Sequence, residues 1–290
     1  DFISEGTVDD IGDAEHFGRF LGGSPANLAR NLAVLGRQSS LVATVGDDGL
    51  GRYLERELAD TGVATDGLAF HDEEPTSTVL IGRSPETPDF LHYRTADTHI
   101  EGDQFDDAHL ADTALFHTTC IALSCDPARS AILEAARRAS DHGSHLSIDA
   151  NYVTDHWQDA AQARETLRTY CAGSTLVKIS MDDIERLFGP DTHSPETAMR
   201  EVHDWGATLV CLTMGSDGSH ISWENGERME FVDAEPVDEV HGATGAGDAY
   251  WSGFLDGWLD GRPPTECAAL GAKIAARKVA SPGPLERPQA

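Results

Sequence analysis

The strongest candidate for a segment that carries chemistry is Gly242-Ala243-Thr244-Gly245-Ala246-Gly247-Asp248, which precedes an apolar run from 249 to 255. Small residues ahead of a helix leave backbone N–H groups uncovered. Together with the positive end of the helix dipole, these amides form an anion site suited to a phosphoryl group. A carboxylate at the end of the loop, Asp248, can accept a proton from a hydroxyl that attacks the phosphorus. The competing interpretation is a glycine-rich turn in which Asp248 only favours the helix dipole.

Two other kinds of phosphate loop are excluded by the context of this segment. No Gly-Lys-Ser/Thr follows the glycines, as a Walker A loop requires. The segment also lies near the C-terminal end, outside a first strand–helix–strand unit, and no acidic residue follows a strand ~20 positions later, as a dinucleotide fingerprint requires. A phosphoryl-transfer loop and a plain turn remain as the alternatives.

A second segment, Leu21-Gly22-Gly23-Ser24-Pro25-Ala26-Asn27, opens the first long helical pattern. The glycine pair lets the backbone approach a ligand closely, and Asn27 offers both a donor and an acceptor on the first helical turn. These properties suit a polyhydroxylated ligand. By itself the segment is equally consistent with an ordinary helix entrance.

The elements that must position these segments alternate along most of the chain. From about residue 110 to 215 the order is strand–helix–strand–helix, which is typical of a parallel sheet covered by helices on both faces. We expect strands at 41–45, 78–81, 90–93, 114–118, 146–149, 176–179, 209–213, 220–223 and 229–232. We expect helices at 25–35, 51–61, 127–142, 163–172, 181–188, 197–205, 246–260 and 264–280. Two short strands flanking the Pro-rich turn 84–88 predict a hairpin, as part of a small subsidiary sheet or lid.

The composition limits the classes of partner. With 21 Lys+Arg against 50 Asp+Glu among 290 residues, the formal net charge is −29, which argues against binding to nucleic acid or to an anionic membrane surface. The sequence contains no run of ~18 apolar residues that could span a membrane, and no basic or long apolar segment opens the chain, so we expect a cytoplasmic protein.

The chain has three lysines, Lys178, Lys273 and Lys278, and this depletion beside so many acids favours a halophilic protein. The five cysteines are scattered and odd in number, which indicates buried thiols, and no His-x-x-x-His pattern predicts a transition-metal site.

Taken together, the segments resemble a known family. Residues 22–27 with Gly46-Asp47-Asp48-Gly49-Leu50-Gly51 resemble the N-terminal signature of the ribokinase-like (PfkB-type) carbohydrate kinases, and 244–250 resembles their C-terminal signature. Segments 149–152, 178–183 and 212–218 fall between them in the family's order. The resemblance covers essentially the whole chain and is strongest to the fructokinase and 2-keto-3-deoxygluconate kinase branch. The acidic, lysine-poor composition adds the expectation of a haloarchaeal member of that branch.

The resemblance implies one ribokinase-like kinase domain over residues 1–290. This is an α/β fold with a doubly wound, mostly parallel sheet and a small β-sheet lid drawn mainly from about 1–20 and 70–100. It implies ATP and Mg²⁺ as cofactors, and the lid sheet is a candidate surface for a homodimer. Asp248 matches the catalytic base, and the amides of Gly245, Ala246 and Gly247 match the anion hole for the transferred phosphoryl group.

The remaining site residues also follow from the resemblance. The family's sugar-binding positions correspond to Asp1, Gly23, Asn27 and the lid residue Arg94, and Asp248 also faces the substrate. The nucleotide-binding positions fall on Lys178, Ser180, Thr213, Gly215, Gly218, Gly245 and Gly247. Asp183 stands where an acidic residue helps organise Mg²⁺ through water.

Two departures from the family pattern affect these expectations. Gly242 stands where the family usually has an Asp that helps hold a monovalent cation, which puts sodium or potassium activation in question. Val153 stands where these branches usually carry an Arg, and that substitution weakens the case for an anionic substrate. We therefore expect ATP-dependent phosphorylation of a fructose-like ketose. The alternatives are a 2-keto-3-deoxygluconate kinase and, in a different class, a catalytically weakened sugar- or nucleotide-binding protein.

Overall fold

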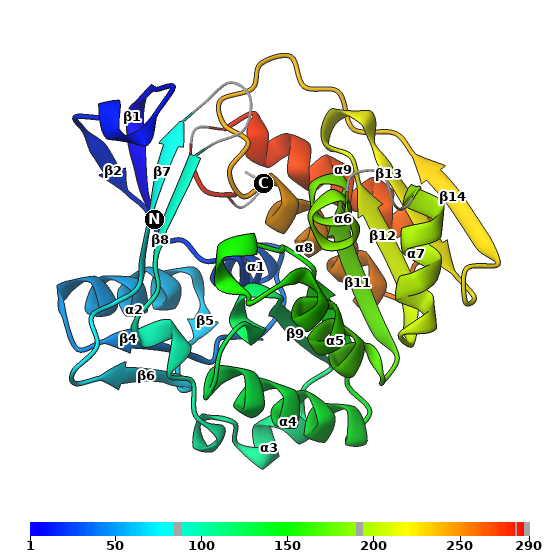
Figure 1. Cartoon of the computed structure of the whole chain (residues 1–290), viewed down its shortest axis with the longest axis horizontal. Coiled ribbons are helices and arrows are strands. Elements are labelled where there is room, and N and C mark those ends of the chain that lie inside the picture. The colour runs from blue at the N-terminus through cyan, green and yellow to red at the C-terminus, as the bar shows by residue number, and fades with distance from the viewer. Residues whose placement is uncertain (84–88, 190–193, 282, 287–290) are drawn as a thin grey trace.

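A six-stranded sheet forms the centre of the computed structural model, which describes residues 1–83, 89–189, 194–281 and 283–286 (Figure 1). The strand order is β14-β13-β12-β11-β10-β9. The first four strands along the chain pair in parallel, and the last two are antiparallel additions at one edge. The strands are β9 (Leu115–Thr119), β10 (His145–Asp149), β11 (Thr175–Ser180), β12 (Ala207–Thr213), β13 (Ser219–Trp223) and β14 (Arg228–Val232).

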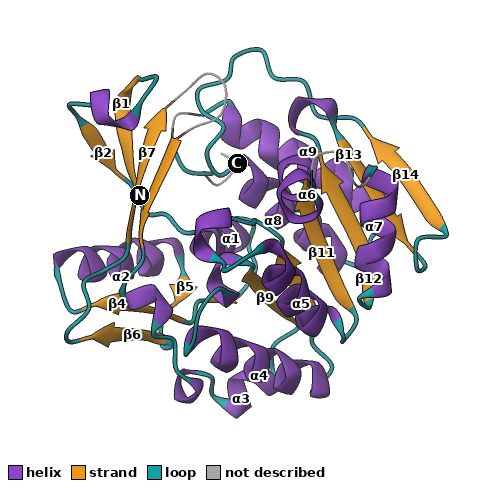
Figure 2. Cartoon of the chain, viewed as in Figure 1, coloured by secondary structure: helices purple, strands orange, loops and turns teal. Residues whose placement is uncertain are grey.

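Helices cover both faces of this sheet (Figure 2). Side chains alternate along β11, so that Val177 packs with one cluster of helices and Leu176 packs with the other. Burial on both faces explains the nearly continuous apolar strands. The first cluster contains α4 (Ala128–Asp141), α5 (Ala160–Cys171), α6 (Met181–Phe188) and α7 (Pro195–Asp204). The second contains α1 (Ser24–Val34), α8 (Ala246–Leu259) and α9 (Pro264–Val279).

A separate four-stranded sheet, with the order β2-β1-β7-β8, stands off the main body (Figure 1). Its strands are β1 (Phe2–Thr7), β2 (Phe17–Arg19), β7 (Thr78–Arg83) and β8 (Asp89–Tyr93). The strand β8 is an edge strand on which Phe90, Leu91 and Tyr93 are all exposed. We call these four strands the lid sheet.

Two short parallel pairs connect the lid sheet to the main body. They are formed by β3 (Ser39–Ser40) with β5 (Val63–Ala64), and by β4 (Ala43–Gly46) with β6 (Leu68–His71). Asp48 begins α2 (Gly49–Thr61) by accepting hydrogen bonds from the Leu50 and Gly51 amides. The same carboxylate accepts from the amide and hydroxyl of Thr76, at 2.8 Å each, and so fixes the chain where it enters β7.

The predicted doubly wound α/β class is confirmed, and each strand and helix expected from the sequence is present with ends shifted by a few residues. The strands β1 and β2 lie within the segment 1–20 from which lid strands were expected, although no bounds were predicted for them. The short strands β3, β5 and β6 and the short helix α3 (Asp107–Ala111) were not predicted. The Pro-rich turn at 84–88 lies outside the described residues. Among the helices of the described ranges, none is long and apolar enough to cross a membrane.

Candidate active site

A cavity of about 600 Å³ lies between the lid sheet and the carboxyl ends of the parallel strands. The lid contributes His92 and Tyr93 to its wall, the start of α1 contributes Gly23 and Asn27, and the glycine-rich loop closes the opposite side. Open α/β sheets bind ligands at the carboxyl ends of their parallel strands, in the crevice that forms where the strand order reverses. One cavity therefore holds both segments that the sequence singles out.

Asp248 lies at the junction of the two segments. Its Oδ1 accepts a hydrogen bond from the Ser24 hydroxyl at 2.5 Å, and its Oδ2 accepts one from the Asn27 amide at 2.8 Å. Packing of Leu28 on α1 and Trp251 on α8 in one apolar cluster brings the starts of these helices together, although they are more than 200 positions apart in sequence. The carboxylate is half-buried and lines the cavity, so it can reach a ligand hydroxyl.

The glycine-rich loop 242–248, which we call the anion loop, presents free amides to this cavity. Gly245 caps α8 with a left-handed backbone (φ 78°), which favours glycine. Within the described chain the amides of Gly245 and Gly247 have no acceptor, as expected for the first turn of a helix. The Ala246 amide differs, because it donates to the Ala243 carbonyl at 3.0 Å. Two of the three amides expected in the anion hole are therefore uncommitted in this conformation.

A buried ion pair lies directly under the loop. The Lys178 Nζ is 2.8 Å from Asp149 Oδ2, and the two side chains are only 6% and 4% exposed. A Cβ added at Gly247 would lie 3.3 Å from Lys178 Nζ, so the ammonium reaches the anion loop. Burial raises the pKa of Asp149 to about 6. Burial opposes the charge of Lys178, but the carboxylates of Asp149 and Asp183 raise its pKa above the usual value.

Asp183 lines the cavity but is already engaged as a helix cap. Its carboxylate accepts hydrogen bonds from the Tyr152 amide at 2.7 Å and from the Ser180 amide and hydroxyl at 2.9 and 2.6 Å. Asp149 Oδ1, by contrast, is a buried oxygen with no donor among the described residues. Asp183 and Asp149 therefore place two carboxylates at this side of the cavity, and carboxylate oxygens are the kind of ligand that Mg²⁺ prefers. Within the described ranges, no cluster of three His, Cys, Asp or Glu could hold a metal by itself.

Arg94 sits at the base of the lid sheet rather than over the middle of the cavity. Its Nε donates to Asp97 at 2.7 Å, and its Nη1 donates to the Ile121 carbonyl at 2.9 Å and to the Ser124 hydroxyl. The Nη2 atom lies 2.6 Å from Asp97 Oδ2 without hydrogen-bond geometry. Arg94 therefore ties the lid to the turn after β9, and Asp97 neutralises its charge.

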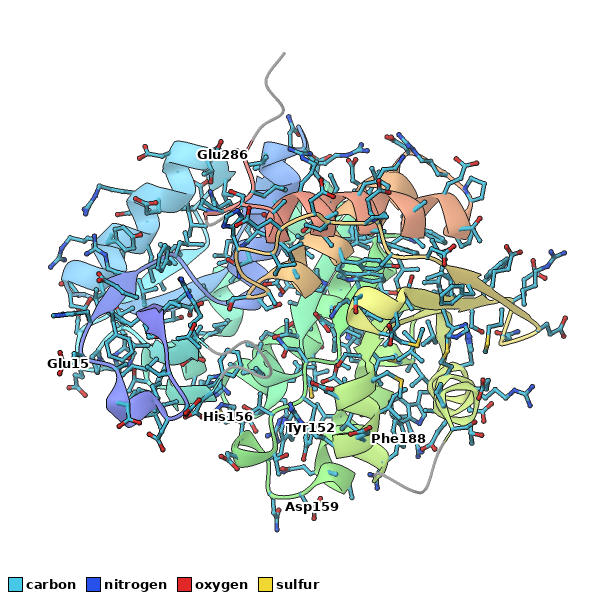
Figure 3. The ribbon with its side chains drawn as sticks, turned by 90° about the horizontal axis from the view of Figure 1, so that it is seen from above. Glu15, Tyr152, His156, Asp159, Phe188 and Glu286 are labelled. Atoms are coloured by element: carbon cyan, nitrogen blue, oxygen red, sulfur yellow. The ribbon has the colours of Figure 1, made fainter. Side chains whose placement is uncertain are left out.

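A second contact between lid and main body joins His92 to His156, whose ring centroids are 4.9 Å apart in an edge-on arrangement. Figure 3 shows His156 on the lid side of Tyr152, in the loop after β10. Burial, together with the nearby Arg94, lowers the pKa of both histidines, that of His156 to about 4. Two uncharged rings therefore form this contact at neutral pH.

The structure brings most of the predicted site residues to one cavity. Its walls include Asp1, Gly23, Asn27, Arg94, Lys178, Ser180, Asp183, Gly245, Gly247 and Asp248. The predicted residues that do not line this cavity are Thr213, Gly215, Gly218 and Ala246. Thr213 lies next to it, because it pairs with the cavity residue Ser180 in the register of β11 and β12. Ser24, Thr244 and Asp149 are cavity residues that sequence reasoning did not assign.

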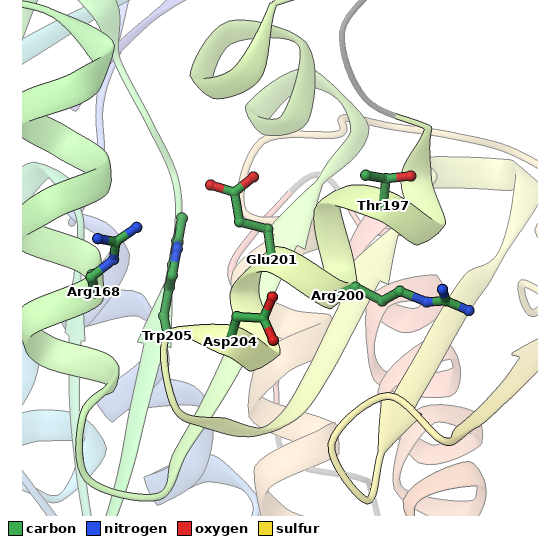
Figure 4. Close-up of a pocket in the computed structure, with 6 residues that line it drawn as sticks. All are labelled: Arg168, Thr197, Arg200, Glu201, Asp204 and Trp205. Carbon is green, nitrogen blue, oxygen red and sulfur yellow. The ribbon is translucent and has the colours of Figure 1, made fainter.

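A second hollow of about 590 Å³ lies between α5 and α7 and is lined by Arg168, Arg200, Glu201 and Trp205, among others. Figure 4 shows the Arg200 side chain directed away from Arg168, so the two guanidinium groups do not converge on one point. None of the predicted site residues lies in this hollow.

Comparisons with known proteins agree with this geometry. The chain matches the pfkB family carbohydrate kinases over residues 2–289. It is 35% identical, over 96% of its length and 84% of the relative, to an ATP-dependent 6-phosphofructokinase of Thermoanaerobacterium thermosaccharolyticum. It is 32% identical, over 94% of its length and 88% of the relative, to a fructokinase of Klebsiella pneumoniae. The solved fructokinase structure of Halothermothrix orenii superposes with a TM-score of 0.81 at 33% identity, covering 94% of each chain.

The doubly wound α/β fold, together with the family match over residues 2–289, places this protein among the phosphoryl-transfer enzymes. The chain belongs to the pfkB family of carbohydrate kinases, and it is a sugar kinase. The predicted family and enzyme class are confirmed.

Proposed function

We propose that this enzyme transfers the terminal phosphoryl group of ATP to a hydroxyl of an unphosphorylated, fructose-like ketose. The observation that carries the proposal is the position of Asp248, held by Ser24 and Asn27 beside the free amides of Gly245 and Gly247. Phosphoryl transfer asks the protein mainly for positioning and charge neutralisation, and this site supplies both.

In the proposed reaction Asp248 accepts the proton of the attacking sugar hydroxyl. Ser24 and Asn27 fix its two oxygens, so that the carboxylate faces the cavity before a substrate arrives. The amides of Gly245 and Gly247, with Lys178 beneath them, stabilise the negative charge on the transferred group. When bound with ATP, Mg²⁺ would neutralise phosphate charge, and Asp183 and Asp149 are the carboxylates placed to meet its water shell.

The charge of the sugar end distinguishes an unphosphorylated ketose from anionic substrates. A sugar phosphate or a keto acid needs an available cation, since a charge-assisted pair contributes ~1.5–3 kcal/mol. The lid-side cation is Arg94, which Asp97 already neutralises, and Asp1 adds a further carboxylate to the same wall. Val153, also in the wall, contributes no charge. Of the other cations in the wall, Lys178 is paired with Asp149, and Arg186 lies 3.9 Å from the Asp182 carboxylate. Fructose therefore fits better than fructose 6-phosphate or 2-keto-3-deoxygluconate.

The test is ADP release from ATP and Mg²⁺ in molar KCl, with fructose, fructose 6-phosphate and 2-keto-3-deoxygluconate supplied in turn. We expect the highest kcat/KM with fructose. A preference for either anionic sugar, selectively lost in Arg94→Gln, would refute the choice of a neutral ketose. Absence of ADP release with every sugar would refute the kinase itself and favour a binding protein.

Two further expectations belong to this proposal. Since ATP is produced inside cells, we place the enzyme in the cytoplasm.

The exposed Phe90, Leu91 and Tyr93 on the edge strand β8 support a homodimer formed through the lid sheet, because an exposed apolar edge strand readily pairs with another chain. Light scattering should give twice the mass of one chain for the wild type and a smaller mass for Leu91→Lys; a monomeric wild type would refute the dimer.

A further inference from the structure

One lysine outside the cavity approaches the anion loop from behind. Lys278 lies in the last turn of α9, and its Cε would be 3.6 Å from a Cβ placed on Gly245. The same position is 4.0 Å from Asn27 Nδ2, so the Lys278 side chain reaches the point where α1 and the loop meet. The His241 amide donates to the Val279 carbonyl at 2.8 Å and fastens the segment ahead of the loop to the end of α9.

The charge of Lys278 is not explained by local pairing. No ion pair or hydrogen bond of its ammonium is found among the described residues, although the chain carries 50 acidic side chains. Lys278 is half-buried, and burial together with nearby Arg30 lowers its pKa, whereas Asp248 raises it. Partly burying an ammonium without a counter-ion costs free energy. Such a cost is tolerated where an anion arrives during function.

The monovalent cation expected in this family does not fit the loop well. Gly242 brings no carboxylate, and apart from its two chain neighbours no atom of the described residues lies within 4 Å of a Cβ built on it. A cation there would have to be held without that side chain. Instead, the Lys278 side chain already brings a positive charge to this loop.

We propose that Lys278 is a positioning residue of the anion loop: its ammonium supplies, on a tethered side chain, a positive charge that would otherwise have to come from a bound cation. The Lys278 Cε lies against Gly245, so its tethered ammonium adds positive charge to this side of the loop. That charge strengthens the attraction of the loop amides for a phosphoryl group, because Coulomb interactions are strong where water is partly excluded. The enzyme consequently needs no sodium or potassium ion at this loop, a requirement that is separate from the salt dependence expected of its acidic surface. This inference rests on the proposed kinase function.

The test compares wild type, Lys278→Ala, Lys278→Met, Lys278→Arg and the control Lys273→Ala, which removes an exposed lysine from the same helix. ADP release is quantified directly by chromatography, so that no coupling enzyme responds to the ion. Total ionic strength is held constant while choline replaces potassium or ammonium. Calorimetry with a non-hydrolysable ATP analogue provides a readout that is independent of turnover.

We expect wild type and Lys273→Ala to be insensitive to this replacement. Lys278→Ala should lose about 10- to 100-fold in kcat in choline and recover part of it with potassium or ammonium, with a parallel recovery in analogue affinity. Lys278→Arg should keep most of the activity. The inference is wrong if Lys278→Ala matches wild type in choline, if ions fail to rescue it, or if wild type itself requires potassium. It is also wrong if Lys278→Ala and Lys278→Met both fail to fold, since Lys278 would then be structural. An inactive wild type would instead refute the kinase proposal.

Discussion

Replacing Lys178 by Met should destabilise the protein strongly, because it leaves the Asp149 carboxylate buried without its counter-charge. The pair is 2.8 Å apart and 6% and 4% exposed, and the other Asp149 oxygen has no donor among the described residues. Removing one partner of a buried pair costs about 3–5 kcal/mol. For a chain of this size, we expect the melting temperature to fall by on the order of 10 °C.

Chemical unfolding of four proteins tests this estimate: wild type, Lys178→Met, the double variant Lys178→Met/Asp149→Leu, and Arg137→Met. The double variant should regain much of the loss, since two apolar side chains leave no unpaired charge. Arg137 pairs with Glu134 and Asp141 on the exposed face of α4 and serves as the control, so its replacement should change the free energy of unfolding far less than Lys178→Met does. A loss below ~1 kcal/mol for Lys178→Met, or additive effects in the double variant, would refute the argument.

Two further predictions concern salt and pH. Thermal melts from about 0.1 to 2 M KCl should rise steeply, because a net charge of −29 repels itself until salt shortens the Debye length to ~3 Å; a flat series would show that the acidic surface is ordinary. Burial raises the pKa of Asp149 from 3.8 to about 6, so the folded state binds this proton more tightly than the unfolded state. Relative to Asp149→Asn, wild type should therefore lose stability as the pH rises from about 4 to 6, and a relative gain over that range would contradict the assignment.

The main sheet and its helices could be predicted because their residues carry strong local signals. The strand β11, for example, is an apolar run buried on both faces, and Ser180 and Asp183 form a capping box that marks the start of α6. The strands β1 and β6 lack such signals. β1 contains Glu5 and Gly6 and is exposed over its last three residues, while β6 has only four residues, so tertiary pairing decides both.

The candidate site could be predicted where one segment contains the whole motif, and not where the fold assembles it. The loop around Asp248 is visible in the sequence because small residues precede an apolar helix. Ser24 was part of a recognised segment, but its hydrogen bond to Asp248 depends on the packing of α1 against α8. Lys278 gave no local signal at all, since it lies thirty positions beyond Asp248 on another helix.

The most direct test of the central claim is sugar-dependent ADP release by Asp248→Asn, beside wild type and Asp256→Asn. Asp256 lies on the same helix and pairs with Arg37, outside the cavity, so this variant controls for the loss of one negative charge on α8. A positioned base contributes at least ~10²-fold. We predict that Asp248→Asn loses this much turnover while it still binds ATP and sugar, and that Asp256→Asn retains its turnover. A loss of less than ~3-fold for Asp248→Asn would contradict its assignment as the base and the mechanism built on it.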